Sequence, residues 1–216
     1  MWPNESQHYR NHRDKLVLAE AELRAKAEEV AALRRDLPPG GTPKEDYIFA
    51  DARTGESVRL SELFGTEHDT LLLYSLMYAP GGKPCPMCTS LLEGLNAAAP
   101  QLSRRMALAV SAKVGPRELL DFSERRGWHN LRFVSSHANN YNHDYRAENG
   151  SGSQLPMMHI WVRRDGETRH FWASELFYHN DPDWRSQPRH ADMIWPLWNV
   201  LDLTPEGRGS DWYPQI

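Results

Sequence analysis

The sequence predicts an α/β domain, a central mixed sheet flanked by helices, preceded by a long N-terminal helical arm. Residues 4–37 contain neither glycine nor proline and are rich in strong helix formers, which indicates the arm. From residue 47 onward, short apolar segments alternate with helix-like segments, an order typical of sheets with parallel strands at their centre. A turn signal at Asp165-Gly166 between two apolar segments adds an antiparallel hairpin near the C-terminus.

The expected arm carries a narrow apolar stripe, because an apolar or aromatic residue recurs every seven positions: Tyr9, Leu16, Leu23, Val30 and Leu37. Such a stripe needs a packing partner. The partner is either the chain's own domain or a second copy, so a homodimer through this helix is one expectation. Prolines and glycines at 38–43 end the helix. We therefore expect an arm and linker at 1–40 and a domain at 41–216.

The elements of the domain follow from apolar pattern and turn residues. The central strand is the longest apolar run, residues 70–78, and we expect the next helix to end before Pro100. Pro196 should kink or restart the last helix. The remaining expectations are strands at 47–50 and 57–60, a helical turn at 61–64, a helix from 85 to 99, a strand at 106–112, a helix at 116–126, a strand at 131–135, hairpin strands at 157–162 and 168–172, and a helix at 191–203.

Charge and hydropathy exclude several partners. The 25 basic and 29 acidic residues nearly balance, without a long basic run, so neither nucleic acid nor an anionic membrane is an expected partner. The longest apolar run is about half the ~20 residues of a membrane helix. The N-terminal residues lack the basic-then-apolar layout of a secretory signal, so the expected location is cytoplasmic.

The two cysteines, Cys85 and Cys88, are the strongest chemical signal in the chain. A disulfide scaffold needs cysteines far apart in sequence, whereas these are separated by two residues at the expected start of a helix. Backbone N–H groups and the positive end of the helix dipole favour a thiolate there. Cys85 is therefore the predicted nucleophile, and Cys88, one turn later and more buried, the predicted resolving thiol.

Neighbouring residues refine this prediction and leave alternatives open. Pro86 fixes φ in the first turn, and Lys83 is a candidate to stabilise the anion. Such exchange needs no cofactor and no metal. A zinc site with His137 and His143 is one alternative, although the spacing fits poorly, and an inert cysteine pair is another.

Pro156 directly precedes the expected hairpin strand at 157–162. In thioredoxin-like folds a cis-proline at this place faces the cysteine pair and exposes backbone for substrate pairing. We therefore expect a cis peptide at Pro156 and a role in substrate binding for Pro156, Pro86 and Lys83. An ordinary trans-proline that opens a strand is the alternative.

Several motifs resemble the thioredoxin-like domain-of-unknown-function family 899, and the resemblance spans nearly the full chain. They are the helix ending in Leu37-Pro38-Pro39-Gly40-Gly41, the Cys85-Pro86-Met87-Cys88 motif, Gly127-Trp128, and Leu201-Asp202-Leu203-Thr204-Pro205-Glu206-Gly207-Arg208-Gly209. The resemblance implies a bacterial origin, a thioredoxin-like fold, and dithiol–disulfide oxidoreductase activity at Cys85, Cys88 and Pro156. The implied partner is a protein or small-molecule disulfide or thiol. After Cys88, the residues Thr89-Ser90-Leu91-Leu92 replace the aromatic and acidic stretch of many family members.

The domain also resembles peroxiredoxins, through its opening strands and Leu60-Ser61-Glu62-Leu63-Phe64-Gly65. Their peroxidatic cysteine follows a proline and a Ser or Thr at fixed distances. If Cys88 takes that cysteine's place, Cys85 takes the place of the hydroxyl residue and Gly81 that of the proline. Disulfide exchange is therefore preferred over a peroxiredoxin-like peroxidase.

Seven of the eight tryptophans fall from Trp128 onward. They either wall a pocket over the dithiol or, as we prefer, fill the core. The Asn-rich stretch 135–144 is expected to be a polar loop without helix, in which His137 or Tyr141 could line the mouth of the site. A non-catalytic thioredoxin-fold protein that uses the aromatic face and the arm for binding or assembly remains an alternative function.

Overall fold

A computed structural model describes residues 2–178, 191–209 and 213–216. The chain divides into two compact units, residues 1–40 and 41–216. The tryptophans at 184 and 212 lie outside the described residues.

The first unit is the predicted long helix, α1, which spans Gln7–Arg35. Ser6 caps it by accepting a hydrogen bond from the backbone N–H of Tyr9 at 3.1 Å. No residue of α1 is buried, and the stripe residues Leu16 and Leu23 are 46% and 65% exposed. The apolar stripe is therefore solvent-accessible along the helix. Within the described part of the chain, every helix is too short or too polar to span a membrane.

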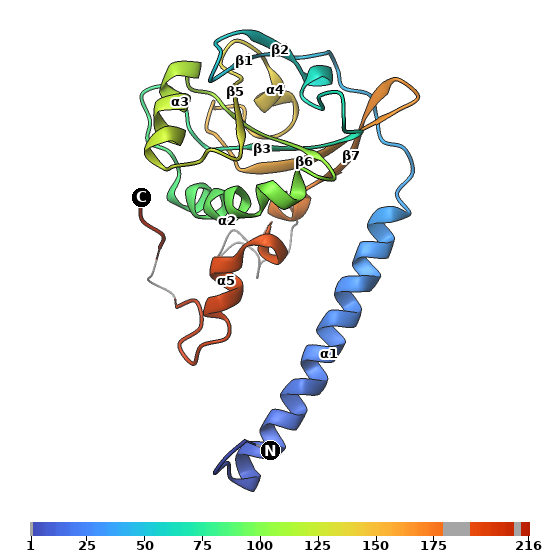
Figure 1. Cartoon of the computed structure of the whole chain (residues 1–216), viewed down its shortest axis with the longest axis vertical. Coiled ribbons are helices and arrows are strands. Elements are labelled where there is room, and N and C mark those ends of the chain that lie inside the picture. The colour runs from blue at the N-terminus through green and yellow to red at the C-terminus, as the bar shows by residue number, and fades with distance from the viewer. Residues whose placement is uncertain (1, 179–190, 210–212) are drawn as a thin grey trace. The chain divides into compact units, whose positions relative to one another are not determined.

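The second unit is built on one mixed sheet of seven strands in the order β2-β1-β5-β4-β3-β6-β7 (Figure 1). The central strands β3, β4 and β5 run parallel, and the others pair antiparallel, which confirms the predicted mixed α/β sheet. The strands are β1 Ile48–Asp51, β2 Ser57–Arg59, β3 Thr70–Ser75, β4 Ala107–Ala112, β5 Arg132–Ser135, β6 Met157–Arg164 and β7 Glu167–Ala173.

The hairpin β6–β7 turns at the predicted place. Asp165 and Gly166 both have positive φ, 52° and 79°, as a two-residue hairpin turn of this kind requires. This hairpin adds β7 at the edge of the sheet and places β6 beside the central strand β3.

Helices cover the sheet on both sides. Figure 1 shows α2 along one face, and the short α4 on the other side of the sheet. Because alternate strand residues point to opposite faces, Leu72 and Tyr74 of β3 pack with α2, whereas Leu71 and Leu73 pack on the opposite side. The helices are α2 Pro86–Leu102, α3 Pro116–Arg125, α4 Tyr141–Asp144 and α5 Pro196–Leu201, with 3-10 turns at Leu60–Glu62, Glu175–Tyr178 and Asp192–Ile194.

Two helical predictions need correction. α2 continues through Pro100 to Leu102, although we expected it to end before the proline. Pro100 has no N–H for the carbonyl of Asn96, but the side-chain amide of Asn130 donates to that carbonyl at 3.2 Å, so the helix keeps this acceptor satisfied. The stretch 135–144, which was expected to contain no helix, ends in the single helical turn α4, Tyr141–Asp144.

Near the C-terminus, the predicted helix restarts at Pro196, as its fixed φ allows. Pro196 occupies the first turn of α5, and a separate 3-10 turn precedes it. The ring nitrogen of Trp195 donates to the Ser90 hydroxyl at 2.8 Å, which fixes this segment against α2. Thus α2 lies between the sheet and the C-terminal segment.

Candidate active site

Cys85 stands where the loop after β3 enters α2. Its backbone N–H donates to Met77 at 3.0 Å, and its carbonyl accepts from both the backbone and the hydroxyl of Thr89, at 3.0 and 2.9 Å. It is the N-cap residue of α2, with Pro86 in the first helical position. The sequence-based placement of Cys85 at a helix start is confirmed. Gly81, with φ of 74°, lets the loop turn before the cysteine.

Cys88 lies one turn further along α2 and faces the interior. It is 1% exposed, whereas Cys85 is half-buried, and both thiols are free. The thiol of Cys88 interacts electrostatically with the sulfur of Cys85. The geometry thus provides one accessible sulfur and one sequestered sulfur in contact.

The electrostatics of the two thiols are opposite. The interaction with the Cys88 thiol, together with the backbone N–H groups of Met87 and Cys88 and the hydroxyl of Tyr213, outweighs burial and lowers the pKa of Cys85 to about 6. Burial raises the pKa of Cys88, and the neighbouring charge of Cys85 raises it further. At neutral pH the pair therefore holds one thiolate, on Cys85, and one thiol, on Cys88.

Two tyrosines that the sequence analysis did not identify contact the cysteine pair. Tyr213, near the C-terminus, places its hydroxyl at Cys85. Tyr74, in β3, is fully buried beside Cys88. Strand alternation could have pointed to Tyr74, because Leu72, Tyr74 and Leu76 share the face that α2 covers. No local pattern links Tyr213 to the cysteines.

The predicted cis peptide at Pro156 is wrong. All described peptide bonds are trans, including the one before Pro156. The backbone N–H of Leu155 donates to Ala147 at 2.8 Å, so the loop is already held in place, and the usual trans form carries the chain into β6. Pro156 is nevertheless buried next to Met157, the register partner of Ser75 at the end of β3. It therefore lies at the edge of the sheet from which the loop to Cys85 starts.

The other candidate residues are dispersed around this edge. Lys83 is exposed two residues before Cys85, and its role toward the thiolate stays a prediction. Of the two histidines in the zinc alternative, His137 hydrogen-bonds Ser135 at 3.1 Å, and His143 is exposed beside Asp144. Across the described ranges, no three His, Cys, Asp or Glu side chains are arranged to hold a metal ion.

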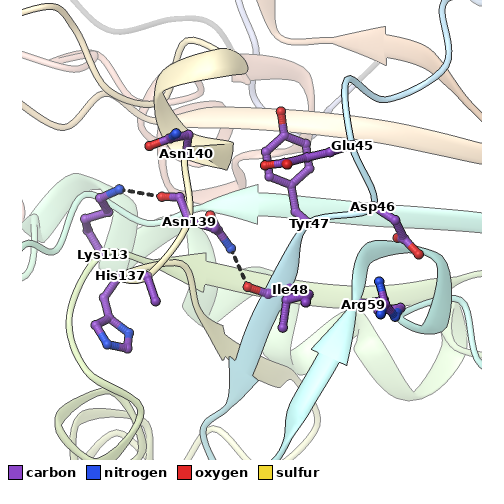
Figure 2. Close-up of a pocket in the computed structure, with 10 residues that line it drawn as sticks. Glu45, Asp46, Tyr47, Ile48, Arg59, Lys113, His137, Asn139 and Asn140 are labelled. Atoms are coloured by element: carbon purple, nitrogen blue, oxygen red, sulfur yellow. Dashed lines mark hydrogen bonds between the residues drawn. The ribbon is translucent and has the colours of Figure 1, made fainter.

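A separate depression of about 670 Å³ opens at the carboxyl ends of β4 and β5. Figure 2 shows His137 beside Lys113, whose amine donates to the carbonyl of Asn139 at 2.9 Å. His137 therefore lines this depression, whose lining includes neither cysteine, and its expected place at the mouth of the cysteine site stays a prediction. Tyr141 does not line the depression, because it is completely buried, in an aromatic cluster with Tyr47 and Phe49 on the sheet face opposite α2.

Of the described tryptophans from Trp128 onward, four lie in the core, as the preferred interpretation expected, and Trp172 is half-buried. Trp128, Trp161, Trp195 and Trp198 are at most 5% exposed. Trp128 stacks on Phe133 with ring centroids 5.9 Å apart, and its ring nitrogen donates to Glu93 at 3.1 Å. Trp128, Trp195 and Trp198 pack on the face of the sheet that α2 covers, and Trp161 packs on the opposite face.

The C-terminal motif 201–209 folds around an arginine. Arg208 donates to Asp192 at 2.9 Å and to Asp202 at 2.7 Å, and its guanidinium lies 5.6 Å from the ring centroid of Trp198. Only 9% of the Arg208 side chain is exposed. The motif thus ties the residues after α5 to those before it.

Comparison with known proteins is consistent with this architecture. The model of the family described as "Bacterial protein of unknown function (DUF899)" matches residues 2–216. The chain belongs to this family. A search of curated proteins found no match.

Solved structures of thioredoxin-like proteins share the fold of this DUF899 protein. Peroxidoxin BcpB from Mycobacterium tuberculosis is 18% identical, with a TM-score of 0.50 over 76% of this chain and 98% of that chain. Peroxiredoxin Q from Xanthomonas campestris is 13% identical, with a TM-score of 0.46 over 62% of this chain and 84% of that one. A peroxiredoxin-like protein from Aquifex aeolicus is 12% identical, with a TM-score of 0.48 over 63% and 75%. The likeness to peroxidoxin BcpB confirms the predicted thioredoxin-like fold.

Proposed function

We propose that the protein is a thiol–disulfide oxidoreductase that uses Cys85 and Cys88 as its redox pair. The observation that carries this proposal is the contact between two free thiols whose pKa values are shifted in opposite directions. A low pKa provides the attacking thiolate at neutral pH, and a buried neighbouring thiol provides the group that resolves the intermediate.

The reaction would proceed in two exchanges. The Cys85 thiolate attacks one sulfur of a substrate disulfide, which forms a mixed disulfide and releases the first substrate thiolate. Cys88 then loses its proton and attacks the Cys85 sulfur, which closes the Cys85–Cys88 disulfide and releases the second thiolate. Two electrons pass from the protein to the substrate, and both released thiolates take up protons. An external thiol returns the pair to its reduced form.

The substrate class we propose is a protein or small-molecule disulfide. Cys85 is half-buried at the start of α2, so a substrate sulfur can approach it, whereas Cys88 is inaccessible. Pro86 adjoins the attacking sulfur, Lys83 precedes it on the exposed loop, and Pro156 lies at the neighbouring sheet edge. These three residues are the proposed substrate contacts.

Trapping the intermediate tests the proposal. The reduced protein is mixed with oxidised glutathione, and the adducts are measured by intact mass. Wild type should form the internal disulfide, Cys88→Ser should stop with one glutathione bound, and Cys85→Ser should bind none. The proposal fails if wild type forms no internal disulfide, or if Cys85→Ser reacts as fast as Cys88→Ser.

Peroxide is the second substrate class to test, because the same Cys85 thiolate could attack it. That reaction would give a sulfenic acid on Cys85 and an alcohol or water, and Cys88 would then form the disulfide with loss of water. With Cys85 as the attacking residue, Gly82 stands three residues before it, where the peroxiredoxin pattern has Ser or Thr. We therefore expect disulfides to react faster than hydrogen peroxide at equal concentration.

We also propose that α1 pairs with α1 of a second copy as a parallel coiled coil. Its apolar stripe is exposed, and no residue of the helix is buried. In the seven-residue register set by Leu16 and Leu23, Lys15 would face the partner's Glu20. Glu29 would likewise face the partner's Arg34. Opposite charges thus flank the stripe, as a parallel pair requires.

A further inference from the structure

We propose that the Tyr74 hydroxyl is the hydrogen-bond donor that stabilises the Cys88 thiolate during the second exchange. This inference rests on the proposed function, because it assigns a residue to its resolving step. It concerns a group that the fold buries at the dithiol and leaves without a structural partner.

The position of Tyr74 follows from the central strand. β3 ends at Ser75, the loop from there leads to Cys85, and Tyr74 points toward α2. Its side chain is fully buried in the cluster that contains Met87 and Cys88. The phenol therefore approaches Cys88 from the sheet side, while Cys85 lies at the entrance of the helix.

The hydroxyl of Tyr74 is unsatisfied in the reduced protein. It interacts electrostatically with the sulfur of Cys88, but in the described part of the chain no group meets the geometry of a full hydrogen bond with it. Buried hydroxyls normally have a partner, as Tyr141 and Tyr47 do here, through Trp161 and Asp144. An orphan hydroxyl at the redox pair is thus explained if its partner is present in another state of the reaction.

That state is the one in which Cys88 carries the charge. While Cys85 is a thiolate, Cys88 keeps its own proton and needs no donor. Once Cys85 is joined to substrate, Cys88 must become an anion in an apolar site, which burial strongly opposes. The Tyr74 phenol O–H beside the sulfur is then a buried donor on the sheet side, and the backbone at Met77 interacts from the loop.

Tyr74 would act as a donor and not as the base. Burial raises its pKa well above the ordinary value, and the cysteine charges raise it further, so the phenol keeps its proton. The proton of Cys88 leaves to water or to the departing substrate thiolate. The Tyr74 O–H makes the remaining anion more abundant and holds it in position beside the Cys85 sulfur.

The test separates the two exchanges with 5,5′-dithiobis(2-nitrobenzoate), which releases one coloured thiolate at each step. Cys85 attack gives the first equivalent, and Cys88 attack on the mixed disulfide gives the second. Tyr74→Phe removes only the hydroxyl. Tyr141→Phe is the matched control, because Tyr141 is equally buried but packs on the opposite face of the sheet. Both phases are followed by stopped flow from pH 5 to 9.

We expect Tyr74→Phe to leave the first phase unchanged and to slow the second about ten-fold or more at pH 7, since one hydrogen bond to a charged group is lost. The pH profile of the second phase should also move to higher pH. Tyr141→Phe should match wild type in both phases. Thermal unfolding of Tyr74→Phe should not fall below wild type, because the deleted hydroxyl has no hydrogen bond to lose.

The outcomes separate this inference from the proposed function. If wild type never releases the second equivalent, the thiol–disulfide exchange itself is wrong. If wild type releases both equivalents and Tyr74→Phe does so with the same rates and pH profile, exchange stands and the role of Tyr74 is overturned. A first phase slowed as much as the second would likewise overturn it, since the effect would then not be specific to Cys88.

Discussion

Cys88, buried inside the domain, interacts with Cys85 at the start of α2 and lowers the pKa of the Cys85 thiol. This contact between sulfurs in different environments sets which of them ionises first. It also makes the reactivity of Cys85 depend on a residue that substrate cannot reach.

Replacing Cys88 should therefore change the titration of Cys85. With a pKa of about 6, Cys85 is mostly thiolate at pH 7, so its alkylation by iodoacetamide should be half-maximal near pH 6 and constant above about pH 7. Cys88→Ala removes the largest contribution that lowers this pKa and should move the midpoint upward, toward the ~8.5 of a free thiol. Cys88→Ser keeps an O–H donor and should stay closer to wild type. Equal midpoints in all three proteins would contradict the assigned interaction.

Tyr213 should contribute a smaller part of the same effect. Its hydroxyl lowers the pKa of Cys85, but less than Cys88 and the backbone N–H groups do, and the side chain is 52% exposed. Tyr213→Phe should raise the alkylation midpoint by less than about one pH unit. Tyr78→Phe is the control, because the Tyr78 hydroxyl donates to Glu118. A midpoint that moves in Tyr78→Phe and not in Tyr213→Phe would refute this assignment.

Removal of the Arg208 side chain should destabilise the domain. The Arg208→Ala substitution leaves Asp192, whose side chain is only 15% exposed, without this cation and uncovers the ring of Trp198. We expect a loss of about 2 kcal/mol, or roughly 4–8 °C in melting temperature. Arg117→Ala should cost less than about 0.5 kcal/mol, because the Arg117 side chain is 85% exposed in its pair with Asp121. Calorimetry of both variants measures the difference. Equal losses in the free energy of unfolding would show that the Arg208 contacts stabilise the domain no more than an exposed ion pair does.

Charges placed in the stripe of α1 should separate the proposed dimer. The double substitution Leu16→Asp and Leu23→Asp would put carboxylates at facing positions of the coiled coil. Sedimentation at tens of micromolar should then show a monomer, whereas wild type and the control Leu18→Asp should sediment as dimers. Leu18 is 66% exposed and lies off the stripe. A monomeric wild type would contradict the proposed dimer and would leave the proposed dithiol chemistry standing.

Local signals explain which features were predictable. The turn at Asp165-Gly166, the helix start at Cys85-Pro86 and the restart at Pro196 each depend on the φ preference of one or two residues, and the structure contains all three. The end of α2 was not predictable in this way, because the Asn130 amide that supports the helix through Pro100 comes from a distant segment. The trans peptide at Pro156 likewise depends on a loop held by Ala147.

The amino-acid sequence alone thus determined the candidate pair, because two cysteines one helical turn apart share one side of any helix they begin. Only the tertiary structure decided what surrounds them. Burial of Cys88 under the sheet, the phenol of Tyr74 from β3 and the phenol of Tyr213 from the C-terminus all depend on contacts between segments far apart in the chain. A thiol's pKa is set by such neighbours and by its desolvation, and these exist only once the chain has folded.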